Sequence, residues 1–267
     1  MSADMPQDHT EDPASHSQAR ALLQASLELL WEGWRPSGKG PKPTLTLERI
    51  VDAAIGVADA DGVEALTMRR LARELGVGTM SLYRYVPDKS VLLDLTLDRV
   101  SIPGDAKREF TRRSWRDALE AEAWEGRALY LRHPWLLQVN WTRPVLGPNS
   151  VAGLELVMSG VESLPLTDQE KILLISVLDA YVTGSVRQQI MYENAAEETG
   201  LSEDEFWETQ LPFLERAMGS GHYPMMSSMA EDSFDGSWEE TFAAGLRHLL
   251  DGLAADLARR EAQGPPA

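Results

Sequence analysis

Apolar residues recur along most of the chain at the three- or four-residue spacing of an amphipathic helix, and no stretch shows the strict alternation of a half-buried strand. An early segment, residues 18–34, has this spacing, with one face formed by Leu23, Leu27, Leu30 and Trp34. Long helices are also predicted over residues 114–132, 150–163, 168–195, 202–218 and 238–260. The pattern therefore predicts an all-α fold.

Between residues 46 and 100 the helical pattern is dense, and capping residues predict where its helices begin and end. Thr46 is placed to cap a first helix, and Gly62 follows its last apolar position. Thr67 is placed to cap a second helix, which ends at Gly76. A short third helix over residues 79–85, and a fourth that begins after Pro87-Asp88, complete this region.

The net charge of −17 argues at first against a nucleic-acid partner, because phosphates demand cationic side chains. The distribution changes this picture, since residues 35–89 hold nine basic and seven acidic side chains and are +2, which leaves −19 on the remainder. The absence of cysteine excludes disulfides and cysteine-liganded metal sites. No apolar run reaches the roughly 18–20 residues of a membrane span, and the N-terminus lacks the pattern of a secretory signal.

The segment from Leu66 to Lys89 reads LTMRRLARELGVGTMSLYRYVPDK and has the layout of a helix-turn-helix. Gly76 supplies the positive φ that the turn between the two helices needs. Val77, Leu82 and Val86 are expected to hold the second helix against the first. The outward face then carries side chains that suit thymine methyls, base edges or phosphates, namely Thr79, Met80, Ser81, Tyr83 and Arg84.

The same segment resembles the DNA-binding signature of the TetR family of bacterial regulators, through its LGV turn and its LYxxVxxK ending. The resemblance implies phosphate contacts from Thr67, Tyr83 and Lys89, and a base contact from Arg69 on the preceding helix. The family's reading positions fall on Thr79, Met80, Ser81, Arg84 and Tyr85. Several of these residues differ in type from the tetracycline repressor, so no operator sequence is implied.

Two non-periodic stretches precede this segment. Residues 1–17 are polar and predict a disordered tail. The stretch RPSGKGPKP predicts a flexible basic arm, which is either a linker or a minor-groove or phosphate arm, with the cations Arg35, Lys39 and Lys42. The predicted organisation is a tail (1–17), an extra helix and basic arm (18–44), a three-helix DNA-binding domain (45–90) and a ligand-binding and dimerisation domain (91–261).

The resemblance continues more weakly through the C-terminal half, where TRP at 142–144 resembles the pocket loop of the tetracycline-repressor branch. Effector pockets are mostly apolar with a few polar groups. Candidates near the loop are Glu122, Tyr130, Trp141, Thr142, Arg143 and Glu155. Asp179 and Thr183, one turn apart on an apolar helix, are either further ligand contacts or hydrogen-bonded core residues. In that branch the drug is bound as a magnesium chelate held partly by histidine, and the residues before the loop here, QVNW, contain no histidine. The comparison with the branch therefore predicts an effector other than a metal chelate.

Aromatic residues of this half are individually expected in the core, namely Trp124, Tyr130, Trp135, Trp141, Phe206, Trp207 and Phe242. The stretches 176–186 and 242–253 resemble the two helices that pair across the dimer in the same branch. The predicted interface residues are Ile172, Ile175, Leu178, Val182, Leu246, Leu249, Leu250 and Leu253. A two-fold dimer sets its recognition helices about 34–36 Å apart, which predicts a roughly palindromic operator.

These expectations describe a cytoplasmic homodimer that binds double-stranded DNA, responds to a small-molecule effector and, by family resemblance, represses. No cofactor, metal or membrane partner is expected, because the sequence contains no HExxH, no Gly-rich phosphate loop and no GxSxG. Two alternatives stay open, an enzyme with an accessory DNA-binding module and a partner protein that has lost DNA binding.

Overall fold

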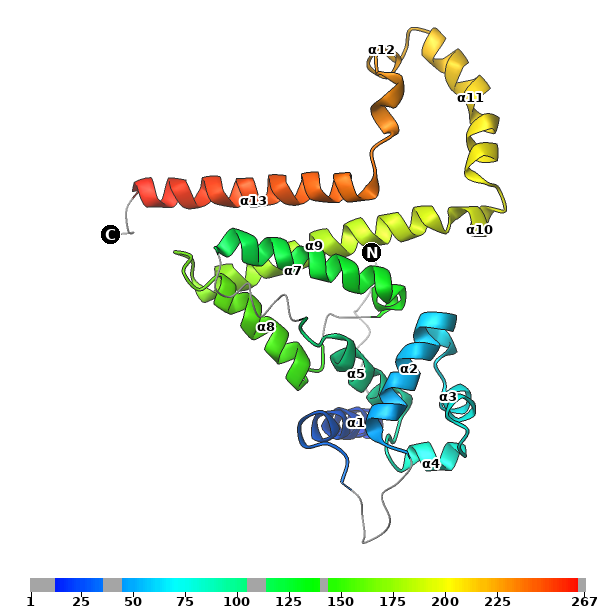
Figure 1. The fold of residues 1–267 in the computed structure, drawn as a ribbon, viewed down its shortest axis with the longest axis vertical. Helices are drawn as coiled ribbons and strands as arrows, with labels where there is room; N and C mark the ends of the chain where they lie inside the picture. Colours follow the sequence, from blue (N-terminus) through cyan, green and yellow to red (C-terminus); the bar gives the residue numbers. More distant parts are fainter. Residues whose placement is uncertain (1–12, 36–44, 105–113, 140–143, 264–267) are drawn as a thin grey trace, which may run out of the picture. The chain divides into compact units, whose positions relative to one another are not determined.

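A computed structural model of the chain describes residues 13–35, 45–104, 114–139 and 144–263. Every regular element in these ranges is a helix, which confirms the all-α prediction (Figure 1). The chain forms two compact units, which are described separately. Unit 1 comprises Met1–Arg113 and Arg132–Gly160, and unit 2 comprises Ser114–Leu131 and Val161–Ala267. None of the described helices is both long enough and apolar enough to cross a membrane.

Unit 1 contains the dense helical region of the sequence, and its helices end where the capping residues predict. The elements are α1 (Pro13–Glu32), α2 (Leu47–Asp61), η1 (Val63–Ala65), α3 (Met68–Leu75), α4 (Thr79–Tyr83), α5 (Lys89–Val100), η2 (Pro134–Gln138) and α8 (Pro148–Gly160). The Thr46 hydroxyl accepts the Arg49 N–H at 3.2 Å at the start of α2. Gly62 ends that helix with a φ of 81°.

The core of unit 1 joins α2, α3, α4 and α5. Its fully buried side chains include Ile50, Leu66, Leu71, Leu82 and Leu92. Each such side chain contributes about 1.5–3 kcal/mol relative to an exposed one, so this small domain depends on all of them. Because Leu82 belongs to α4 and Leu71 to α3, the same core fixes the two helices of the helix-turn-helix against each other.

α1 belongs to this unit and packs against α5, and its packed face agrees with the predicted one only in part (Figure 1). Leu30 and Trp34 pack on the core as predicted, whereas Leu23 and Leu27 are 47% and 37% exposed. Their place on the core is taken by Leu22, Ala25 and Leu29, which the prediction missed because a serine lies among them. Ser26 is fully buried there, since its hydroxyl donates to the Asp94 carboxylate at 2.6 Å.

α1 also begins earlier than predicted, at Pro13 instead of residue 18, so the disordered tail does not extend to residue 17. Proline suits a first helical position because its missing N–H has no intrahelical acceptor there. The rest of the predicted tail, residues 1–12, lies outside the described residues.

We expect the contact between α1 and α5 to weaken as pH rises. Burial raises the pKa of the Asp94 carboxyl, and the hydrogen bond from Ser26 opposes this only in part. A carboxyl whose folded pKa exceeds its unfolded pKa stabilises the fold when protonated, and this contribution is lost as pH rises through the folded value. In urea unfolding followed from about pH 4 to 7, Asp94→Asn should therefore gain stability relative to wild type as pH rises. Parallel pH profiles for the two proteins would contradict this.

A second deviation concerns the domain boundary, which the sequence placed near residue 90. Residues 91–104 and 132–160 group with the helix-turn-helix instead. The buried carboxylate of Asp98 on α5 explains this, because it accepts the N–H groups of Asn149 at 3.1 Å and Ser150 at 2.9 Å. A side chain on Gly147 would collide with this carboxylate. Asp98 therefore caps α8 from a different helix.

Unit 2 is a bundle whose long helices begin and end within a few residues of the predicted ranges. Its elements are α7 (Trp115–Arg132), α9 (Asp168–Glu193), α10 (Ala195–Thr199), α11 (Glu203–Gly219), α12 (Pro224–Ser227), η3 (Glu231–Phe234) and α13 (Trp238–Gln263). Capping boxes begin α9, at Thr167 and Glu170, and α11, at Ser202 and Glu205. The core lies among α7, α9 and α13, where Phe242 contacts the rings of Trp124 and Tyr181.

Candidate DNA-binding site and effector-binding residues

The turn of the helix-turn-helix is closed by Gly76, as predicted. Its φ of 67° and ψ of 31° lie in the left-handed region that favours glycine. The Gly76 N–H donates to the Arg73 carbonyl at 3.2 Å, and the Val77 N–H donates to the Ala72 carbonyl at 3.0 Å. This pair of bonds is a Schellman motif, which satisfies the last carbonyls of α3 and directs the chain into α4.

α4 is five residues long and has one buried side chain on one face and an exposed surface on the other. Leu82 is fully buried, whereas Met80 is 76% and Tyr83 is 44% exposed. Thr79 and Ser81 are partly exposed. These four residues therefore lie where the sequence predicts a reading surface, on a helix held by its one buried side chain.

The cations beside α4 differ in what they contact. Arg70 is engaged within the protein, because its guanidinium pairs with Asp61 at 3.2 Å and with Glu74. Arg69 and Arg84 are exposed and have no acidic partner among the residues that the structure describes. Their positive charge is therefore available to an anion such as a phosphate or to the acceptors of a base edge.

Two further residues that are predicted to contact phosphates, Thr67 and Lys89, lie at the starts of helices. Thr67 is exposed and is the N-cap of α3, where its hydroxyl accepts the Arg70 N–H at 3.1 Å. Lys89 is the first residue of α5 and is partly exposed, directly after the N-cap Asp88. Both positions leave the side chain or the adjoining backbone accessible, which a phosphate contact requires.

Tyr85 is the predicted reading residue that the structure contradicts. It is only 6% exposed, and its hydroxyl donates to the Leu45 carbonyl at 2.8 Å. Its ring stacks on Trp34, with ring centroids 4.3 Å apart. The residue follows the end of α4, so the backbone directs its side chain into the core instead of along the outer face of the helix. Tyr85 therefore supports α4 from within.

The basic arm is described only at its first residue. Arg35 is exposed and pairs with Glu32 at 3.2 Å, a surface contact that contributes little to stability. Lys39 and Lys42 lie outside the described residues. The choice between a linker and a DNA-contacting arm therefore stays a prediction.

In unit 2, three of the predicted effector contacts lie together between α7 and α9. Tyr130 is buried, and its hydroxyl lies 3.4 Å from the carboxylate of Asp179. Burial raises the pKa of the Tyr130 hydroxyl, and the negative charge of Asp179 raises it further, while a hydrogen bond with Thr183 lowers it. Desolvation also raises the pKa of Asp179, although the residue as a whole is exposed. The three groups form a connected polar cluster on an apolar background.

The remaining effector candidates are Glu122, Glu155 and three residues of the predicted pocket loop. Glu122 lies two turns earlier on α7 and is partly buried, close enough for its charge to raise the pKa of Tyr130. Glu155 is exposed on α8, which belongs to unit 1. The loop residues Trp141, Thr142 and Arg143 lie outside the described residues. Among the residues that the structure does describe, no three histidine or carboxylate side chains gather as a metal site.

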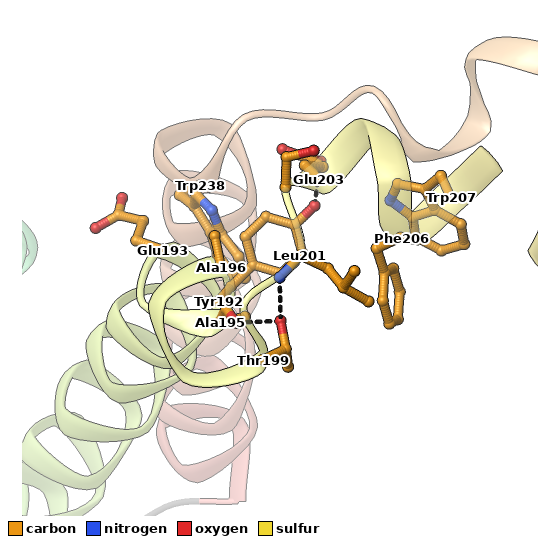
Figure 2. Close-up of a pocket in the computed structure, with 11 residues that line it drawn as sticks. Tyr192, Glu193, Ala195, Ala196, Thr199, Leu201, Glu203, Phe206, Trp207 and Trp238 are labelled. Carbon is orange, nitrogen blue, oxygen red and sulfur yellow. Dashed lines mark hydrogen bonds between the residues drawn. The ribbon is translucent and has the colours of Figure 1, made fainter. Parts of the chain in front are cut away.

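Sequence reasoning missed a groove of about 400 Å³ at the end of the bundle (Figure 2). It lies where the end of α9, α10 and the start of α11 meet the start of α13, and its lining includes Tyr192, Phe206, Trp207 and Trp238. Phe206 and Trp207 were expected in the core, yet each is 43% exposed. Aromatic residues on a helix full of glutamate, as in EDEFWET, are the signal that distinguishes them.

The predicted dimer residues divide into two groups. Four are buried within the chain itself, namely Leu178, Val182, Leu246 and Leu250. Because they are buried in the core of a single chain, the structure contradicts their assignment to the dimer interface. Ile172 is 44% exposed, and Ile175, Leu249 and Leu253 are partly exposed. Leu173 and Val177, at 63% and 47% exposed, extend this face along α9.

Two short helices joined by a turn at a left-handed glycine, with Arg69 and Arg84 exposed and without an acidic partner among the described residues, define a helix-turn-helix DNA-binding protein. Comparison with known proteins agrees. Residues 50–95 match the profile "Bacterial regulatory proteins, tetR family", and residues 110–257 match "Tetracyclin repressor-like, C-terminal domain". The chain is 50% identical over 244 residues to the HTH-type transcriptional repressor DrrR1 of Streptomyces coeruleorubidus, covering 91% of this chain and 90% of that one.

Solved structures give the same answer. The Streptomyces coelicolor TetR family protein ActR in complex with (S)-DNPA superposes with a TM-score of 0.61 at 28% identity, covering 80% of this chain and 99% of that one. ActR in complex with actinorhodin superposes with a TM-score of 0.57 at 27% identity over the same shares. The chain belongs to the TetR family of bacterial transcriptional regulators.

Proposed function

We propose that this protein is a dimeric transcriptional repressor that binds a palindromic operator through two copies of α4 and is released by a small-molecule effector bound in unit 2. The observation that carries the proposal is the exposed surface of Arg69, Met80, Tyr83 and Arg84 on a fixed helix-turn-helix. As a regulator of bacterial promoters it acts in the cytoplasm, and the family favours regulation over catalysis.

Electrostatics support the orientation of this surface toward DNA. Residues 35–89 are +2 while the rest of the chain is −19. DNA is therefore repelled by most of the protein and attracted at one region, which favours a single docking orientation. Arg69 and Arg84 supply the local charge, because Arg70 is held by two acidic partners.

The test is binding to the DNA that flanks the gene, with fluorescence anisotropy on a labelled duplex and a scrambled duplex of the same length. The proposed function requires that the flanking duplex bind at least about 10³-fold more tightly than the scrambled one at physiological salt. Equal affinity for the two duplexes would exclude a sequence-specific regulator. It would leave the two alternatives, an enzyme with an accessory DNA module or a partner protein.

We further propose that the effector is a largely apolar, aromatic molecule with a polar edge, and that Tyr130, Asp179 and Thr183 contact that edge. In this cluster the buried hydroxyl of Tyr130 meets the exposed carboxylate of Asp179 between two helices of unit 2. Glu122, Trp141, Thr142, Arg143 and Glu155 remain candidate contacts. The ligands seen in ActR support a small-molecule effector for this branch of the family.

The aromatic groove at α10 and α11 is the second candidate position for the effector, because its volume of about 400 Å³ is that of a small-molecule site. Two variants separate the positions, with actinorhodin as the probe in isothermal titration calorimetry. Tyr130→Phe removes one hydroxyl and should weaken binding about two- to tenfold if the cluster holds the polar edge. Trp207→Ala should leave affinity unchanged in that case. The opposite result would place the probe in the groove, and magnesium-dependent binding would contradict an effector other than a metal chelate.

A further inference from the structure

Trp34, two residues after the end of α1, contacts the end of the recognition helix directly. The Trp34 indole N–H donates to the Arg84 carbonyl at 3.1 Å, at the C-cap of α4. Its ring also stacks on Tyr85, the buried residue that follows α4. A short helix depends on external partners for its last carbonyls, so Trp34 holds the end of α4 at a point where the helix itself offers no partner.

One turn earlier, α1 contacts the segment that leads into α8. The Trp31 indole N–H donates to the Leu146 carbonyl at 3.1 Å. Trp31 is 55% exposed, so its ring adds little to the core and the hydrogen bond is its main contact. Leu146 precedes the N-terminus of α8 by two residues and follows the 142–144 loop that the sequence singles out.

α1 is fixed between these two contacts by its packing on α5. Ser26 is fully buried and bonded to Asp94 on α5, and Leu22 and Leu29 pack on the core around it. The helix is therefore attached to α5, to the end of α4 and to the segment before α8, all within unit 1. It lies outside residues 50–95 and 110–257, which the two family profiles match.

We propose that α1 is a coupling element in which Trp34 positions the recognition helix and Trp31 ties that position to the start of α8. A displacement of the segment before α8 then reaches α4 through α1 as well as through α5. The two tryptophans are positioning residues, because neither is placed to read DNA. The inference rests on the proposed function only in requiring that the protein bind an operator.

Linkage makes the proposal testable without an effector. If the start of α8 and the recognition helix are coupled, fixing one by DNA binding must stabilise the other. We expect operator binding to slow hydrogen–deuterium exchange in a peptide covering residues 147–155 of the wild-type protein. Trp31→Phe should bind the operator within about twofold of wild type but lose the part of that protection that passes through α1, while the part that passes through Asp98 on α5 remains. Trp34→Phe should lose the same part and also bind the operator about two- to tenfold more weakly per subunit.

Leu23→Ala is the matched control, since Leu23 lies on the same helix and is 47% exposed. It should match wild type in both measurements. Wild-type exchange at residues 147–155 that does not change on operator binding would overturn the proposal, as would a Trp34→Phe variant with unchanged affinity and protection. If the wild type bound no operator, the proposed function itself would fail. A failure of coupling alone, with operator binding intact, leaves the repressor function standing.

Discussion

Leu173→Glu combined with Val177→Glu is expected to yield a monomer at micromolar concentration and to weaken operator binding by at least about 10³-fold. On α9 the Leu173 side chain is 63% exposed and the Val177 side chain is 47% exposed, and the neighbouring Ile172 is 44% exposed. Such a contiguous apolar face indicates a partner surface. The two introduced carboxylates would be buried in that face without a compensating positive charge, so the dimer should not form. A monomer then contacts one half-site and loses the second helix-turn-helix.

Sedimentation velocity and operator titration check this result on the same samples. Leu23→Glu with Leu27→Glu is the control, because these side chains are exposed to a similar degree on α1 and lie outside the proposed interface. The control should remain a dimer. A double Glu variant on α9 that sediments as a dimer would remove this face from the interface and would direct attention to Leu249 and Leu253 on α13.

Arg69→Ala is expected to weaken specific operator binding by about 1–3 kcal/mol and to relax selectivity at one base pair in each half-site. Arg69 is exposed and has no acidic partner among the described residues, so its guanidinium is free to bond a base edge. A bidentate contact between arginine and a base contributes about 1–3 kcal/mol of discrimination against the wrong base. The measurement is titration against the operator and against duplexes with single base-pair changes.

Arg70→Ala is the matched control for this experiment. Arg70 differs from its neighbour because Asp61 and Glu74 engage its guanidinium. Its loss should lower the midpoint of thermal unfolding slightly and leave base selectivity unchanged. If Arg70→Ala relaxed selectivity as much as Arg69→Ala, the assignment of the base contact to Arg69 would be wrong.

Local chemistry explains which parts of the fold the sequence could predict. Thr46, Gly62, Thr67 and Gly76 each end or begin a helix through a bond or a dihedral angle within a few residues. Such signals are present in the sequence itself, so the helix limits and the turn were predictable. The reading surface followed from the turn, since the face opposite Leu82 must be exposed once Leu82 is buried.

The predictions were wrong where contacts with residues distant in the sequence determine whether a side chain is buried. Tyr85 is buried because Leu45 accepts its hydroxyl and Trp34 covers its ring, and neither contact can be inferred from the spacing around Tyr85. Leu178 and Leu250 are apolar residues on apolar helices, and periodicity alone does not distinguish a face packed within one chain from a face packed against a second chain. Ser26 concealed the packed face of α1 because its partner, Asp94, lies on a different helix.

The division of α4 into one buried residue and an exposed surface affects how the protein can evolve. Met80, at 76% exposed, contributes almost nothing to the core, so substitutions there change stability by no more than about 0.5 kcal/mol. Mutations at Thr79, Met80 and Ser81 can therefore be sampled without loss of the fold, the effector site or the dimer. After gene duplication, one copy can acquire a new operator by drift at these positions while it keeps its response to the original signal.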